Sequence, residues 1–184
     1  MNLHFATSNP NKLSELSELL EYRLTPLELD LQEIQTTDLQ ELVKHKLKQA
    51  YEHIHAQVIV EDTSLYFKAW NEPPGPRVQW FIENLGLAGM VSALSQFKDK
   101  SAQAVCCLGY TNIGKSMYLF EGKVKGVIVK PRGSLNFGWD AIFQPSEHEQ
   151  TFGEMDPEDK NRISPRGKAA TKFKHFLTQS AKQT

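Results

Sequence analysis

The spacing of hydrophobic residues predicts that strands alternate with amphipathic helices in the first part of the chain. Short apolar runs separated by polar segments are typical of buried strands. Leucines that recur every three or four positions indicate helices with one buried face. Asn9 and Pro10 suit the N-cap and the first turn of the first helix. The predicted strands cover 3–6, 24–29 and 58–60, and the predicted helices follow Asn9 and cover 39–55.

The rest of the chain changes character after a stretch rich in proline and glycine at 71–76, which must be a loop. Because strand–helix alternation comes first and neighbouring strands follow, we expect an α/β fold with a mixed sheet. The long connection over 131–166 is expected to be mostly irregular, and such connections are usually functional. Further helices are predicted at 78–85 and 87–97, further strands at 101–110 and 116–129 (bent at Gly122 or Gly126), and a last helix carrying Ala169, Phe173, Phe176 and Leu177 inward.

Length, net charge and cysteine content indicate a single-domain cytoplasmic protein. The 184 residues suffice for one domain, 1–184, and the formal net charge is −1. Near-zero charge gives no broad basic surface for nucleic acid. We expect no signal peptide and no contact with membranes, because no apolar segment is long enough. The adjacent Cys106 and Cys107 lie in an apolar run that predicts a buried strand, and free cysteines fit a cytoplasmic protein.

The first candidate site is the segment Thr7-Ser8-Asn9-Pro10-Asn11-Lys12, between a strand and a helix. Free N–H groups and the positive end of the helix dipole suit phosphate there. Lys12 adds a cation in the first turn, where only an anion would compensate it. The alternative is a plain helix cap with Lys12 in water.

The second candidate is Glu61-Asp62-Thr63, directly after an apolar strand. Active sites of α/β proteins lie at such strand ends. With Glu33, these carboxylates would suit Mg²⁺, which also binds substrate phosphates. Ordinary turn chemistry is the alternative.

The third candidate is Phe137-Gly138-Trp139-Asp140. Its aromatic rings offer a stacking surface for a base, and Asp140 can accept a hydrogen bond from a ring N–H. The alternative is that Phe137 and Trp139 are core residues beneath a loop.

The fourth candidate is the segment from Lys160 to Arg166, which concentrates three cations before the last helix. An anionic ligand would explain that arrangement. A solvated basic turn is the alternative.

In this order, the four segments resemble the inosine triphosphate pyrophosphatase family. The family pattern Thr-Gly-Asn-x-x-Lys corresponds to 7–12, with Ser8 replacing glycine, and the acidic strand end corresponds to 60–65. Pro74-Gly75-Pro76 with Trp80-Phe81 is similar to the eukaryotic-type branch. Further matches are 130–133, 137–140, 143–145 and 160–166.

The resemblance implies a homodimer whose subunits have an elongated central sheet with helices around it and two lobes that flank a deep cleft. It implies an Mg²⁺-dependent hydrolase that cleaves non-standard purine nucleoside triphosphates (ITP, dITP, XTP) to the monophosphate and pyrophosphate. The role of the family is to remove such nucleotides from the nucleotide pool.

The resemblance also implies roles for individual residues. Asp62 would orient or deprotonate the attacking water, and Lys12 would assist catalysis. Glu33 and Asp62 would hold Mg²⁺. Lys46 would reach the phosphates, with Lys44 and Lys48 as alternatives. The remaining substrate contacts would come from Thr7, Ser8, Asn9, Pro10, Asn11, Thr63, Phe137, Gly138, Trp139, Asp140, Lys160 and Arg166.

The chain departs from the family at Pro165, where the family has histidine. Proline offers neither the side-chain donor nor a backbone N–H. A site that loses a hydrogen-bond partner discriminates less well, so we expect weaker selectivity against adenine nucleotides. Two alternatives are a catalytically silent nucleotide-binding module and a related pyrophosphatase with a different base preference.

Overall fold

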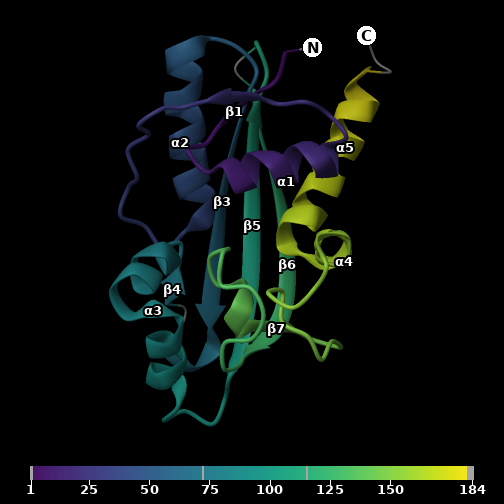
Figure 1. The fold of residues 1–184 in the computed structure, drawn as a ribbon. Coiled ribbons are helices and arrows are strands. Elements are labelled where there is room, and N and C mark those ends of the chain that lie inside the picture. Colours follow the sequence, from purple (N-terminus) through teal and green to yellow (C-terminus); the bar gives the residue numbers. More distant parts are fainter. Residues whose placement is uncertain (1, 72, 115, 182–184) are drawn as a thin grey trace.

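The computed structural model describes residues 2–71, 73–114 and 116–181, which form one elongated mixed sheet surrounded by helices (Figure 1). The strand order is β2-β1-β3-β5-β6-β7, and β4 pairs with β3 outside this sequence. The first three strands in that order are parallel and the others antiparallel. The strands are β1 (His4–Ala6), β2 (Thr25–Leu27), β3 (Val58–Phe67), β4 (Pro74–Gly75), β5 (Ser101–Thr111), β6 (Met117–Ile128) and β7 (Phe143–Pro145). The mixed α/β fold is therefore confirmed.

The helices begin and end as capping rules require. Helix α1 starts at Pro10, and the side chain of Asn9 accepts hydrogen bonds from the N–H groups of Asn11 and Lys12. Asp38 caps α2 in the same way. Gly86 interrupts α3 with φ 65°, which confirms two helical segments meeting there. The helices are α1 (Pro10–Leu20), α2 (Leu39–Ile54), α3 (Val78–Leu94), α4 (Pro157–Ile163) and α5 (Pro165–Ala181).

The two faces of the sheet are covered by different helices. Helices α1 and α5 pack on one face, around Phe5, Leu108 and Phe173. Helix α2 packs on the other face through Val43 and Leu47. Cys106 and Cys107 point to opposite faces and are both buried, which confirms the predicted buried strand.

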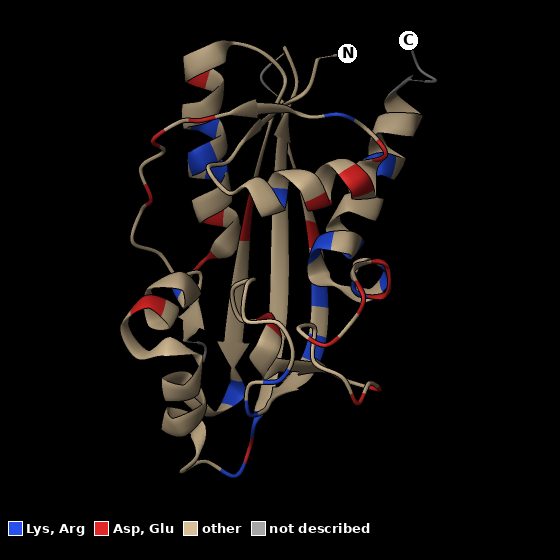
Figure 2. Ribbon diagram, in the orientation of Figure 1, with Lys and Arg blue, Asp and Glu red and all other residues tan. Residues whose placement is uncertain are grey.

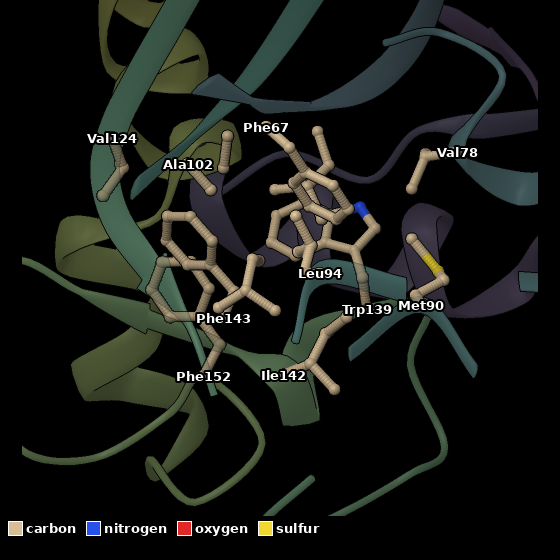
Figure 3. Packing of buried hydrophobic residues seen from close by; sticks show 13 residues of the cluster. Phe67, Val78, Met90, Leu94, Ala102, Val124, Trp139, Ile142, Phe143 and Phe152 are labelled. Atoms are coloured by element: carbon tan, nitrogen blue, oxygen red, sulfur yellow. The ribbon is translucent and has the colours of Figure 1, made fainter. Parts of the chain in front are cut away.

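A third hydrophobic cluster fills the other end of the sheet. Trp139 lies in the middle of it and makes edge contacts with Phe143, while Phe143 stacks on Phe152 (Figure 3). Helix α3 closes the cluster with Met90 and Leu94. The sheet thus carries two separate packed lobes on its α1 and α5 face.

Between these lobes, one edge of β3 has no strand neighbour within the described parts of the chain. Strand β1 pairs with β3 only at Val58 and Ile59, and β4 pairs with it only at Leu65 and Tyr66. The other edge of β3 is paired with β5 along its whole length. The unpaired edge in between contains 61–63 and opens toward the cleft described below.

Two predictions about local structure are wrong. Strand β3 does not end at Val60 but continues through Glu61 and Asp62 to Phe67, paired with β5 along its whole length. Strand β2 is shorter than 24–29. The connection 131–166 is mostly irregular, as predicted, although it contains a 3₁₀ turn (Asp140–Ile142), β7 and α4.

Strand β6 continues without a break through Gly122 and Gly126, the two positions at which a bend was predicted. Both glycines let neighbouring backbone approach the strand closely. A Cβ atom at Gly122 would overlap the carbonyl oxygen of Pro165, and one at Gly126 would overlap that of Gln144. The predicted loop 71–76 contains the short strand β4 and a cis bond between Pro73 and Pro74. Glu72 lies outside the described residues.

Candidate active-site cleft

A cleft of about 460 Å³ lies between the two lobes, and residues from all four candidate segments line it. It is lined by all of the predicted site residues except Pro10, whose place is the first turn of α1. Pro165 also lines it. The predicted residues that it brings together are Thr7, Ser8, Asn9, Asn11, Lys12, Glu33, Lys46, Asp62, Thr63, Phe137, Gly138, Trp139, Asp140, Lys160 and Arg166.

The segment 7–12 is a genuine helix cap, yet Lys12 does not point into water. Its ammonium lies 3.2 Å from Oε2 of Glu61. The N–H groups of Asn11 and Lys12 are held by the side chain of Asn9. A phosphate at this helix start would therefore compete with Asn9 for these donors or bind to the neighbouring N–H groups.

Lys46 lies between two carboxylates in the same cleft. Its Nζ is 2.9 Å from Oε1 of Glu33 and 2.9 Å from Oδ2 of Asp62. The other oxygen of Asp62 accepts the N–H of Thr63 at 2.8 Å. Lys44 and Lys48 are exposed and do not line the cleft. The structure therefore favours Lys46 over both alternatives as the lysine that faces the ligand.

Glu61 lies at the bottom of the cleft, and its side chain is wholly buried. Besides Lys12, it binds the guanidinium of Arg166 at 3.2 Å and accepts the thiol of Cys106 at 3.2 Å. Burial alone would raise the pKa of Glu61, but Arg166 and Lys12 outweigh it and lower the pKa to about 2. Burial and the charge of Glu61 raise the pKa of the Cys106 thiol well above its ordinary value. The carboxylate is thus a permanent negative charge between two cations.

The other end of the cleft holds a second group of charges. Arg166 also binds Glu15, whose Oε1 lies 3.6 Å from Nζ of Lys160. Lys160 contacts Oδ2 of Asp140 at 2.6 Å. Burial raises the pKa of Asp140, and Lys160 opposes this effect only in part.

These contacts join both ends of the cleft in one line of alternating charges. Figure 2 shows acidic positions within the sheet near basic positions on the helices in front of it. Two buried atoms in the line lack a hydrogen-bond partner among the described residues: Nε of Arg166 and Oε1 of Glu15. An unpaired buried polar atom costs about 1–3 kcal/mol, which a bound polar ligand would recover. The line runs Lys12, Glu61, Arg166, Glu15, Lys160, Asp140.

The two aromatic residues of the third candidate segment, Phe137 and Trp139, differ in how far they face the cleft. Trp139 is buried in the hydrophobic cluster and only borders the cleft. Phe137 is half-buried, and the cations of Lys160 and Arg166 lie 4.2 Å and 5.2 Å from its ring. Phe137 is therefore the aromatic ring that a ligand in the cleft would meet.

Sequence reasoning missed one important residue and misjudged the surroundings of another. Glu15 was not singled out, although its position one helical turn after Lys12 puts both on the same side of α1. Glu61 was grouped with Asp62, but neighbouring strand residues point to opposite faces. That alternation was the available signal that the two carboxylates have different surroundings.

The carboxylates of Glu33 and Asp62 suit a magnesium ion that also binds a ligand. Within 2–71, 73–114 and 116–181, no three His, Cys, Asp or Glu side chains form a group that would hold a metal by themselves. Mg²⁺ commonly uses one or two carboxylates and takes its other ligands from phosphates and water. Two carboxylates directed at one point fit that pattern.

The fold and the cleft together define an α/β protein with a site suited to a small polyanion that carries an aromatic ring. The model of the Ham1 family matches residues 3–176. The chain therefore belongs to the Ham1 family.

Individual relatives agree with this assignment. The chain is 43% identical to an inosine triphosphate pyrophosphatase of Scheffersomyces stipitis, over 94% of this chain and 96% of the relative. It is 45% identical to the protein of that name from Pyricularia oryzae, over 96% and 94%. A solved HAM1 protein structure from Coxiella burnetii is 28% identical, with a TM-score of 0.85, over 97% and 99%. The resemblance to the inosine triphosphate pyrophosphatase family is thus confirmed, with fungal and therefore eukaryotic relatives.

Proposed function

We propose that this protein hydrolyses non-standard purine nucleoside triphosphates, such as ITP, dITP and XTP, to the monophosphate and pyrophosphate. The observation that carries the proposal is a single cleft with lysines and carboxylates at one end and an aromatic ring beneath cations at the other. Relatives 43–45% identical over nearly the whole chain are named inosine triphosphate pyrophosphatases, which supports the same reaction here.

The residues divide the reaction between them. Asp62 orients the water that breaks the bond between the α and β phosphates, while Lys12 and Lys46 neutralise the leaving pyrophosphate. Glu33 and Asp62 would hold Mg²⁺, which supplies charge to polarise the phosphoryl oxygens and lower the pKa of water. Phosphate binding by 7–12 would release Lys12 from its pair with Glu61.

The other end of the cleft would receive the base. Phe137 would stack on the purine, with Trp139 and Asp140 beside it. Oxopurines present an acceptor at O6 and a donor at N1, whereas adenine presents a donor and an acceptor at these positions. Nε of Arg166, which has no hydrogen-bond partner among the described residues, is a donor that suits O6 of an oxopurine, which supports a preference for ITP.

The test is the release of pyrophosphate and inosine monophosphate from ITP by the purified protein, with and without Mg²⁺. We expect turnover with Mg²⁺ and none after chelation with EDTA. Binding of ITP without pyrophosphate release would instead support a silent nucleotide-binding module. A panel including XTP, ATP and pyrimidine triphosphates would reveal an altered base preference.

Assembly and location belong to the same proposal. We propose a homodimer, as the resemblance implies, and light scattering on the purified protein measures this directly. No described helix has the length and apolar character needed to cross a membrane. The cytoplasmic location is proposed from the free cysteines, and imaging of a tagged protein would test it.

A further inference from the structure

The ammonium of Lys46 occupies the place between the two carboxylates that would hold the metal. It lies 2.9 Å from an oxygen of Glu33 and 2.9 Å from an oxygen of Asp62. The lysine extends from the middle of α2, and only 15% of its side chain is exposed. The ammonium is therefore held within hydrogen-bond distance of both carboxylates.

A metal ion would compete with this ammonium. Mg²⁺ bound by both carboxylates lies about 2.1 Å from each ligand oxygen. Because Nζ of Lys46 already contacts these two oxygens, the ion would come within a few ångströms of another positive charge. Like charges at that distance repel strongly in a partly buried site. The metal and the ammonium cannot share the pair in its present arrangement.

A triphosphate provides a second partner for Lys46. The lysine lines the same cleft as Thr7, Ser8 and Lys12, so phosphates held by that segment would lie within the same space. Their negative oxygens would accept the ammonium and also complete the coordination of the metal. Glu33 is largely exposed, with 61% of its side chain accessible, and is free to follow the rearrangement.

We propose, on the basis of the proposed function, that Lys46 makes the protein specific for triphosphates over monophosphates. Its ammonium keeps Mg²⁺ from binding to Glu33 and Asp62 until a triphosphate draws that ammonium away. Metal and triphosphate then bind cooperatively, and by linkage each strengthens the binding of the other. A nucleoside monophosphate carries fewer negative oxygens and draws Lys46 away less effectively. Loss of pyrophosphate thus returns Lys46 to the carboxylates and releases the metal.

The test measures metal binding to the nucleotide-free protein. Mn²⁺, which prefers similar oxygen ligands, is titrated by calorimetry and by its electron paramagnetic resonance signal. Lys46→Met removes the charge and keeps an unbranched side chain, and we expect it to bind Mn²⁺ about tenfold more tightly than the native chain or better. Lys48→Met, on the same helix but exposed and paired with Glu52, is the control and should leave the affinity unchanged.

Two further measurements assign the effect. Adding Glu33→Gln to Lys46→Met should remove the gain, and an ITP analogue with a methylene α–β bridge should tighten Mn²⁺ binding far more in the native chain than in Lys46→Met. Lys46→Gln is measured alongside, so that the result does not depend on the folding of one variant.

The proposal is overturned if neither Lys46 variant binds Mn²⁺ more tightly than the native chain, or if the gain survives Glu33→Gln. Failure of the proposed function would show separately, as no pyrophosphate release from ITP by the native protein with Mg²⁺.

Discussion

Glu61 and Arg166 form an ion pair at 3.2 Å in which both side chains are buried beneath the cleft. Arg166 is the second residue of α5, and Glu61 lies in the middle of β3. The pair therefore fastens the last helix to the sheet at the point where a ligand would bind. Its loss would affect both the stability of the protein and the shape of the cleft.

We expect Glu61→Gln to destabilise the protein by about 3–5 kcal/mol, because it removes the buried carboxylate that Lys12 and Arg166 share and leaves Arg166 with Glu15 alone. Urea denaturation at neutral pH measures this. Glu121→Gln, which removes a sheet carboxylate paired with Lys123 near the surface, is the control and should cost less than about 1 kcal/mol. Equal effects of the two substitutions would contradict the special position of Glu61.

The same pair predicts how stability depends on pH. Folding lowers the pKa of Glu61 from 4.5 to about 2, so its contribution is complete above pH 4.5 and is lost as pH falls toward 2. We expect the ionised Glu61 to contribute about 3 kcal/mol to the free energy of unfolding. The difference in unfolding free energy between the native chain and Glu61→Gln should shrink over that interval. A difference that stays constant from pH 5 to 2 would show that Glu61 does not titrate as the geometry requires.

Asp62→Asn tests the catalytic assignment. The substitution keeps the shape of the side chain but removes the charge that would orient water and bind the metal, so kcat for ITP should fall about 100-fold or more. Calorimetry should still detect the nucleotide. Asp159→Asn, at an exposed position in α4, should keep the native rate. A near-native kcat for Asp62→Asn would remove this residue from the reaction.

Pro165→His tests base selection. Pro165 is buried, begins α5 and borders the cleft. A histidine there adds a donor for the six-position oxygen, so the ratio of kcat/KM for ITP over ATP should rise about tenfold. If the native chain already discriminates as sharply as the variant, the loss of histidine has no effect on selectivity.

Gly122→Ala tests the contact between β6 and α5. The added methyl group would overlap the carbonyl oxygen of Pro165 and crowd the backbone of Ala169. We expect a loss of about 1–3 kcal/mol in stability and a lower kcat/KM, because the displaced helix carries Arg166. Gly114→Ala, where the nearest described atoms to the new methyl group belong to the side chain of Asn112 and lie at ordinary contact distance, should change neither.

Hydrophobic periodicity was sufficient to predict most helices and the long strands, because the buried stripes of α1, α2 and α5 follow the helical repeat. It failed at β3, where a charged pair in the sequence normally marks the end of a strand. Glu61 is buried within the strand, where it pairs with Lys12 and Arg166, which are distant in the sequence. Such partners come from the folded chain and leave no local pattern.

The candidate site could be predicted as a set of residues but not as a set of contacts. Motif resemblance collected the correct segments around one cleft. It did not indicate that Lys46 binds both Glu33 and Asp62, or that Trp139 belongs mainly to the hydrophobic cluster. These arrangements depend on side-chain packing between elements.

The alternating charges from Lys12 to Asp140 also matter for anyone who wishes to redesign this protein for another nucleotide. Each charge in that line has a neighbour of opposite sign on either side, except at the two ends. Replacing one residue takes one partner from each of its neighbours, so single substitutions will show strong epistasis. Libraries that vary adjacent members of the line in pairs, keeping their summed charge, should retain folded variants that one-residue scans would discard.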